Sequence, residues 1–305
     1  MKEEFARIIN EIGKVFVGNV GQVELAVACL LAEGHLLLED LPGLGKTTLA
    51  RTLAEVFQLE HARVQFTSDL LPGDILGMSV FDRQTETMTF HPGPVFTQVL
   101  LADEINRATP RTQSALLEAM SESQVTIDGM TRSLPAPFFV IATQNPVSQS
   151  GTYPLPESQL DRFLMRLSLG YPAPEAEREL LVRAHETAPV VPAVPDGWLL
   201  EVRAAVRNCY MSDSVLDYLQ RLIAFTRESA DFRVGLSPRA GMALAQAARS
   251  VAVMAGRDHV IPEDIQRVLE PVAAHRVQPV SGTSGGARAL LQAMTQKVDS
   301  ISHSA

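Results

Sequence analysis

The stretch from His35 to Ala50 constrains the fold of this chain more than any other stretch does. It opens with the apolar run Leu36–Leu38, which predicts a short buried strand. A loop with two glycines follows, and beyond it come apolar residues at helical spacing, namely Leu49, Leu53 and Val56. A strand, a glycine loop, a Lys-Thr pair and a helix in this order predict a phosphate-binding P-loop.

The chemistry of such a loop assigns roles to its residues. Glycines let backbone N–H groups approach phosphate oxygens, and the helix that follows directs its positive N-terminal end at the same anion. Lys46 can reach the β- and γ-phosphates, and the hydroxyl of Thr47 can bind Mg²⁺. We therefore assign nucleotide binding to Asp40, Leu41, Pro42, Gly43, Leu44, Gly45, Lys46, Thr47 and Thr48.

One position departs from the usual P-loop pattern. The pattern G-x-x-x-x-G-K-[ST] begins with glycine, whereas this chain has Asp40 there, so the strict motif fails. A bare Gly-Lys-Thr also occurs by chance, and the alternative is a strand, a turn and a helix with a surface lysine. Polar residues elsewhere in the chain favour the P-loop over this alternative.

Acidic and amide side chains follow two further apolar strands. Val99–Ala102 leads directly into Asp103 and Glu104, and the strand predicted at 138–143 ends close to Asn145. In an open α/β sheet, ligands bind at the carboxyl ends of the strands. Asp103 can hold Mg²⁺ through water, and Glu104 can orient and deprotonate the attacking water. Asn145 can hydrogen-bond the γ-phosphate or that water; a simple turn residue before a proline is its alternative.

Composition and charge exclude several classes of function. The net charge of −9 argues against nucleic-acid binding as the main activity, since phosphate backbones require clustered Lys and Arg. Cys29 and Cys209 are far apart and predict reduced core thiols, and the seven histidines show no metal-ligand spacing. No apolar run approaches the roughly 18 residues of a membrane span, so we expect a cytoplasmic protein without a transmembrane segment.

The organisation of the chain predicts more than one unit. We place an α/β nucleotide-binding domain at 1–171, an all-α lid domain at 172–277 and a flexible tail at 278–305. A break at Tyr171–Pro174 marks the boundary. Two hairpin insertions are expected near 78–91 and 124–134. The lid helices are expected near 175–186, 197–207, 212–229, 238–255 and 262–276.

Residues outside the strand ends complete the candidate site. Ser237-Pro238 predicts a helix start, which puts Arg239 beside a positive helix N-terminus where it needs an anion such as a nucleotide phosphate. Arg162 precedes the last predicted strand, and one explanation for it is a local salt bridge with Asp161 or Glu157. Val17 and Gly18 precede the P-loop strand and could cover the adenine, although simple core packing is about as consistent with them.

Taken together, the run Glu39–Thr47, the run Asp103–Arg107 and the ending Gly235–Ala240 resemble an AAA+ ATPase, most closely of the MoxR family. The resemblance covers about Val15 to Val277, and the family tolerates a non-glycine at the position of Asp40. It implies a P-loop NTPase fold with a five-stranded parallel sheet flanked by helices, a smaller all-α lid and a hexameric ring. The two hairpins look like the insertions of the AAA+ branch that includes magnesium-chelatase motors.

By the same resemblance, Asn145 looks like sensor 1, Arg162 like the arginine finger that reaches a neighbouring subunit, and Arg239 like sensor 2 on the lid. Such proteins act as chaperone-like motors on partners that often carry a von Willebrand A domain, sometimes with metal insertion. We therefore expect Mg²⁺-dependent ATP hydrolysis that remodels a partner protein, with ATP between the sheet domain and the lid. The alternatives are a nucleotide-gated scaffold without essential turnover and a small-molecule P-loop kinase.

Overall fold

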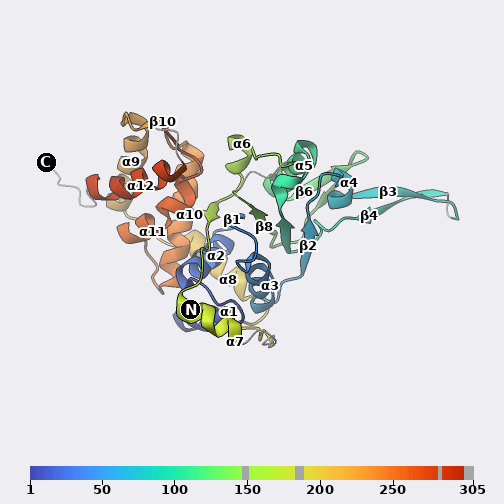
Figure 1. The fold of residues 1–305 in the computed structure, drawn as a ribbon, viewed down its shortest axis with the longest axis horizontal. Coiled ribbons are helices and arrows are strands. Elements are labelled where there is room, and N and C mark those ends of the chain that lie inside the picture. Colours follow the sequence, from blue (N-terminus) through green and yellow to red (C-terminus); the bar gives the residue numbers. More distant parts are fainter. Residues whose placement is uncertain (85, 146–150, 183–188, 281–283, 299–305) are drawn as a thin grey trace.

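The computed structural model describes residues 1–84, 86–145, 151–182, 189–280 and 284–298. Figure 1 shows a central sheet with helices on both faces, the C-terminal helices gathered at one end and a long two-stranded arm at the other. No helix among the described residues is long and apolar enough to cross a membrane.

The central sheet has five parallel strands, as predicted. Their spatial order is β2-β5-β8-β1-β9. The strands are β1 (Leu36–Glu39), β2 (His61–Gln65), β5 (Val99–Asp103), β8 (Phe139–Gln144) and β9 (Met165–Leu167). Because all five strands run the same way, the P-loop after β1, the acids of β5 and the end of β8 meet at one edge.

The sheet is buried on both faces, which explains its nearly continuous apolar strands. Leu36 and Leu38 of β1 belong to one core, whereas Leu37 between them belongs to the other. The first core also includes residues of α1 (Lys2–Val15), α2 (Val20–Leu31), α3 (Lys46–Val56) and α8 (Trp198–Asn208). The second core lies under α4 (Pro72–Leu76) and α5 (Pro110–Glu122).

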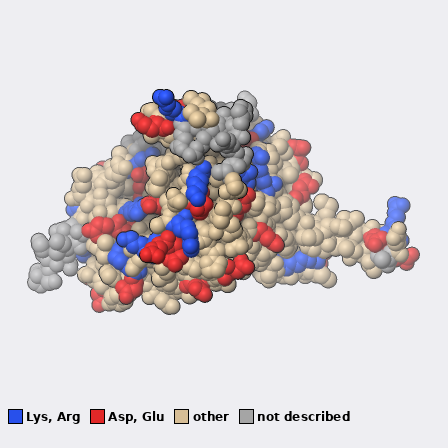
Figure 2. Space-filling model, turned by 90° about the horizontal axis from the view of Figure 1, so that it is seen from below, with Lys and Arg blue, Asp and Glu red and all other residues tan. Residues whose placement is uncertain are grey.

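Two antiparallel hairpins lie where the sequence predicts them. They are formed by β3 (Gly77–Asp82) with β4 (Thr87–Pro92), and by β6 (Gln124–Ile127) with β7 (Met130–Ser133). The β3–β4 arm projects from the body (Figures 1 and 2). Its exposed apolar side chains include Met78, Val80, Phe81 and Met88. At its base, the Arg132 guanidinium lies 3.9 Å from the ring centroid of Phe90, which connects the second hairpin to the first.

The C-terminal part is mainly helical, as expected. It contains α7 (Pro174–Val182), α9 (Asp213–Glu228), α10 (Pro238–Met254), α11 (Pro262–Ala273) and α12 (Ser284–Lys297). Its helices α10 and α8 pack on α2, so this part shares a core with the sheet domain. The predicted end of the first lid helix, 183–186, lies outside the described residues, and the domain boundary at 171 stays a prediction.

Beside the lid helices lies one short antiparallel pair, β10 (Phe232–Val234) with β11 (Gln278–Pro279). One expectation for this part was wrong. The tail from 278 is not flexible over its described length, because α12 buries Ala287, Leu291 and Met294 in the main core. These three side chains lie on one face of the helix, a pattern that a Ser- and Gly-rich start obscures in the sequence.

Candidate active site

The P-loop turn has the backbone geometry that phosphate binding requires. Gly43 and Gly45 have φ angles of +87° and +80°, a region that residues with a Cβ rarely adopt. Gly45 is also the N-cap of α3, so Lys46, Thr47 and Thr48 form the first turn of that helix. An added Cβ on Gly43 would meet no atom within 4 Å, which leaves open space beside the loop backbone.

Asp40 explains why this loop does without its first glycine. Its carboxylate accepts hydrogen bonds from the Ser168 hydroxyl at 2.9 Å and from the backbone N–H of Leu169. The side chain is buried and ties the P-loop to the segment after β9, instead of facing the phosphate space. The backbone carbonyl of Asp40 accepts a hydrogen bond from Lys46 Nζ at 2.6 Å, a contact that any residue at this position could make.

Asp103 and Glu104 end strand β5 in a fixed arrangement. The Thr143 hydroxyl, from β8, donates to Asp103 Oδ1 at 2.6 Å and accepts from the Glu104 backbone N–H at 2.9 Å. Glu104 adopts φ +56° and ψ +49°, which ends the strand abruptly and turns its side chain away from the sheet. Such a conformation costs energy in a non-glycine residue and is common at functional sites.

Asn145 connects the P-loop lysine with Glu104. Its Oδ1 accepts from Lys46 Nζ at 3.1 Å, and its Nδ2 donates to Glu104 Oε1 at 3.1 Å. Burial lowers the pKa of Lys46, and the negative charges of Asp40, Asp103 and Glu104 oppose that shift. The structure therefore brings together the lysine, the acids and the amide that the sequence predicts, although they lie far apart in the chain.

Three further polar residues of this site were missed by the sequence analysis. Arg63 donates to Asp103 Oδ2 at 2.7 Å, while Gln65 Nε2 and Arg107 Nη1 donate to Glu104 Oε2 at 2.9 and 2.8 Å. Arg63 and Gln65 come from β2, whose end lies beside β5. Only the spacing of Glu104 and Arg107, three residues apart, could have indicated one of these contacts in advance.

These residues line an open pocket of about 550 Å³, which comprises Pro42, Gly43, Gly45, Lys46, Thr47, Thr48, Arg63, Gln65, Asp103, Glu104, Arg107 and Asn145. The predicted binding residues Val17, Gly18, Asp40, Leu41 and Leu44 are not among its lining residues. Gly18 packs instead against the ring of Phe16, which lies close to Gly45 on its other side.

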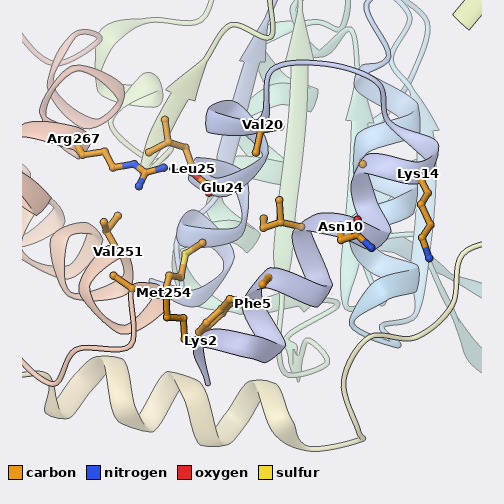
Figure 3. Close-up of a pocket in the computed structure, with 14 residues that line it drawn as sticks. Lys2, Phe5, Asn10, Lys14, Val20, Glu24, Leu25, Val251, Met254 and Arg267 are labelled. Carbon is orange, nitrogen blue, oxygen red and sulfur yellow. Dashed lines mark hydrogen bonds and ion pairs between the residues drawn. The ribbon is translucent and has the colours of Figure 1, made fainter. Parts of the chain in front are cut away.

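A second hollow of about 790 Å³ lies between α1, α2, α10 and α11 (Figure 3). Its lining is largely apolar and includes Phe5, Leu25, Val251 and Met254, with the Arg267–Glu24 ion pair at one side. None of the P-loop residues or strand-end acids lines it. The smaller, polar pocket is therefore the one with groups suited to a phosphate.

Arg162 and Arg239 lie outside the P-loop pocket of their own chain. Arg162 donates to the Ser121 hydroxyl, and Arg239 Nε lies 3.8 Å from Asp161 Oδ2. Asp161 precedes β9, and the first residue of β9 pairs with the first residue of β1. Asp161 and the two arginines therefore lie toward the amino ends of the strands, opposite the P-loop. No described lid residue lines the P-loop pocket, contrary to the expectation of a lid over the chain's own nucleotide.

The donor set of the pocket fits Mg²⁺. The Thr47 hydroxyl and the Asp103 carboxylate are oxygen ligands on its wall, and Mg²⁺ typically takes few protein ligands together with substrate phosphates and water. No group of three or more His, Cys, Asp or Glu side chains suited to a metal occurs among the described residues. The magnesium site predicted at Thr47 and Asp103 thus needs the phosphates to complete it.

Comparisons with known protein families match both parts of the chain. The family described as "ATPase family associated with various cellular activities (AAA)" matches residues 35–165, and the AAA lid domain matches residues 224–294. The lid match includes most of α12, in agreement with its packing on the core.

Similar proteins cover most of the chain. The uncharacterized protein YeaC of Bacillus subtilis (strain 168) is 43% identical over 89% of this chain and 86% of its own length. The chaperone MoxR1 of Mycobacterium tuberculosis is 42% identical over 89% of this chain and 74% of its own. A crystal structure of a candidate ATPase from Cytophaga hutchinsonii has a TM-score of 0.89 and 37% identity, covering 98% of this chain and 95% of that one.

Proposed function

Because the chain belongs to the MoxR family of AAA ATPases, we propose that it hydrolyses ATP with Mg²⁺ to remodel or mature a partner protein. The observation that carries the proposal is the chain of contacts from Lys46 through Asn145 to Glu104, next to Asp103. It joins a phosphate-binding cation, a polar sensor and a candidate base at one edge of the sheet.

The main polar groups of the pocket have chemical tasks in this proposal. The backbone N–H groups of the glycine turn and Lys46 hold the phosphates. Mg²⁺, when bound at Thr47 and Asp103, neutralises charge on the β- and γ-phosphates. Glu104 orients the attacking water and accepts its proton, and Asn145 aligns that water with the γ-phosphate. Arg107 and Gln65 hold Oε2 of the Glu104 carboxylate, and Asn145 Nδ2 donates to its Oε1.

The position of Arg162 and Arg239 supports action between subunits. Both lie beside Asp161, away from their own P-loop, whereas a neighbouring copy in a ring could place its nucleotide against them. We assign both arginines to the γ-phosphate of the adjacent subunit in a homo-oligomeric, hexameric ring. An arginine supplied in this way is worth about 10³–10⁵ in rate, or roughly 4–7 kcal/mol of barrier.

The client is proposed to be a protein with a von Willebrand A domain, with metal insertion into it in some cases. The exposed apolar side chains of the β3–β4 arm offer a contact surface for such a client. Nucleic acid is not proposed: Lys and Arg are interspersed with Asp and Glu on the face in Figure 2, without a continuous basic patch. A P-loop kinase is disfavoured because Glu104, directly after β5, lines the pocket as a base that can act on water.

Replacement of Glu104 by Gln tests hydrolysis directly. We expect the variant to bind ATP normally and to lose about 10²–10⁴ in kcat, the usual contribution of a positioned base. Glu118→Gln, at an exposed position of α5, is the matched control and should hydrolyse ATP at the wild-type rate. Turnover by Glu104→Gln at that same rate would refute the assignment. Partner activation that survives in the inactive variant would instead favour a scaffold without essential turnover.

A further inference from the structure

A buried arginine outside the pocket holds the segment that carries Arg162. Arg276 follows α11, and its side chain is only 5% exposed. Its guanidinium donates to Asp161 Oδ1 at 2.7 Å, to the Phe163 carbonyl at 2.7 Å and to the Leu164 carbonyl at 3.0 Å. It also contacts the carbonyl of Asp161, at 3.3 Å, and that of Val272.

Short-range backbone hydrogen bonds, such as Arg162 N–H to the Gln159 carbonyl at 3.1 Å, and the buried Phe163 also hold the segment around Arg162. Its only regular structure is α6 (Glu157–Leu160), a helix of four residues, and Arg162 comes just after it. The carbonyl groups of Asp161, Phe163 and Leu164, which follow this helix, need donors from elsewhere, and His275 Nε2 also contacts that of Phe163 at 3.1 Å. The planar fork of Arg276 supplies these donors on both sides of Arg162, which an ammonium group could not do with the same geometry.

The carboxylate of Asp161 also faces Arg239. Arg239 Nε lies 3.8 Å from Asp161 Oδ2, while Arg276 bonds to Oδ1 of the same carboxylate. Arg239 is in the first turn of α10 and Arg276 follows α11, so one acid connects two lid helices to the backbone next to Arg162. The exposed Arg239 and the half-buried Arg162 thus both lie next to Asp161, whose carboxylate the buried Arg276 holds.

We propose that Arg276 and Asp161 are a positioning pair, which fixes Arg162 and Arg239 relative to each other so that both reach one nucleotide of the neighbouring subunit. The inference rests on the proposed action of these arginines between subunits. Arg276 is too deeply buried to touch the nucleotide itself, so its effect on turnover is indirect. Through this pair, the lid is held on the side of the sheet domain that faces the neighbouring subunit, away from the P-loop of the same chain.

Arg276→Lys tests the pair because it keeps the positive charge and removes the planar guanidinium with its several donors. We expect kcat to fall by about 10²-fold, as for a misplacement of about 1 Å, with no change in the dissociation constant for ADP at the intact P-loop. Arg257→Lys is the matched control, since Arg257 binds both oxygens of Asp264 within the lid at 2.7 and 2.6 Å. This control should keep its kcat. A similar loss in both variants would reduce Arg276 to a general lid contact and overturn the proposal.

Asp161→Asn provides a second route if Arg276→Lys does not fold. The amide oxygen can still accept from Arg276, whereas the negative charge that faces Arg239 is gone. We expect a lower kcat with unchanged ADP binding here too, and no further loss when Asp161→Asn is added to Arg239→Ala, because the lost charge faces Arg239. A wild-type kcat in Asp161→Asn, or independent losses in the double variant, would overturn the proposal.

Mixed rings separate this inference from the proposed function. Arg276→Lys subunits have an intact P-loop, and Lys46→Ala subunits have an intact Arg162 side, so a mixture assembled from both should exceed the summed activity of the two variants alone. Arg162→Ala mixed with Lys46→Ala is the reference. If the reference mixture shows no gain, action between subunits is refuted. If the reference gains and the Arg276→Lys mixture does not, only the positioning role is refuted.

Discussion

Replacement of Asp40 by Gly restores the usual P-loop sequence, yet we expect it to destabilise this protein. The carboxylate accepts two hydrogen bonds, from Ser168 Oγ and from the buried Leu169 N–H. Hydrogen bonds to a charged group contribute about 1.5–3 kcal/mol each, and a buried N–H left without a partner costs about 1–3 kcal/mol. The added freedom of glycine costs roughly a further 0.5–1 kcal/mol.

These contributions are not additive, because the half-buried Ser168 hydroxyl can turn to water when the carboxylate is lost. We therefore expect a net loss of about 2–4 kcal/mol in the free energy of unfolding. Nucleotide binding should suffer less, since Lys46 bonds to the backbone carbonyl of residue 40 and not to its side chain.

The single tryptophan, Trp198, provides the assay. It is buried, and its ring centroid lies 5.2 Å from that of Phe5 in an edge-on contact, so its fluorescence should report unfolding of the shared core in urea. Asp40→Asn is the matched control, because its side-chain oxygen can still accept from Leu169, and it should lose less stability than Asp40→Gly. Equal stability of Asp40→Gly and the wild type would refute a stabilising role of the hydrogen bonds between Asp40 and the segment after β9.

Three further outcomes are expected from the same geometry. Asn145→Ala removes the link between Lys46 and Glu104, and it should lower kcat more than ATP affinity, as steady-state kinetics and a binding titration would reveal. Burial lowers the pKa of His35 from 6.5 to about 4, so the unfolded state binds more protons below pH 6.5, and His35 should contribute up to about 3 kcal/mol to a fall in stability between pH 6.5 and 4. Burial also lowers the pKa of His275, which adds to that fall, so His35→Gln should reduce the pH dependence measured in urea titrations without removing it. Gly93→Ala should destabilise the base of the β3–β4 arm, because an added Cβ would overlap the backbone oxygen of Ile75. Hydrogen exchange of the arm should accelerate, whereas Gly13→Ala, in α1 with no atom within 4 Å of the added Cβ, should leave the arm unchanged.

Local patterns account for what was predicted well. The structure confirms the strand, glycine turn and helix of the P-loop stretch, the strands before Asp103 and Asn145, and the helix start at Ser237-Pro238. Each of these depends on neighbouring residues. The hairpin positions were also predictable, because alternation and turn residues are local signals.

The errors share a different cause. Arg63 reaches Asp103 only because β2 lies beside β5 in the sheet, and strand order is not a local property. The lid position depends on apolar contacts of α10 with α2 and α8, and these contacts keep Arg239 near Asp161 and away from the P-loop. Helix α12 was missed because its weak amphipathic pattern gains stability only from the core that it covers.

The sequence by itself determined which chemical groups this protein presents, namely a phosphate-binding turn, a strand ending in two acids, an amide, and two arginines further along the chain. Backbone conformation and side-chain periodicity are short-range properties, so they can be read from neighbouring residues. Only the tertiary structure decided which groups share a site: the lysine, acids and amide meet at one sheet edge, while both arginines lie apart beside Asp161. Burial of apolar faces between distant segments sets that division, and it acts over separations that no local pattern records.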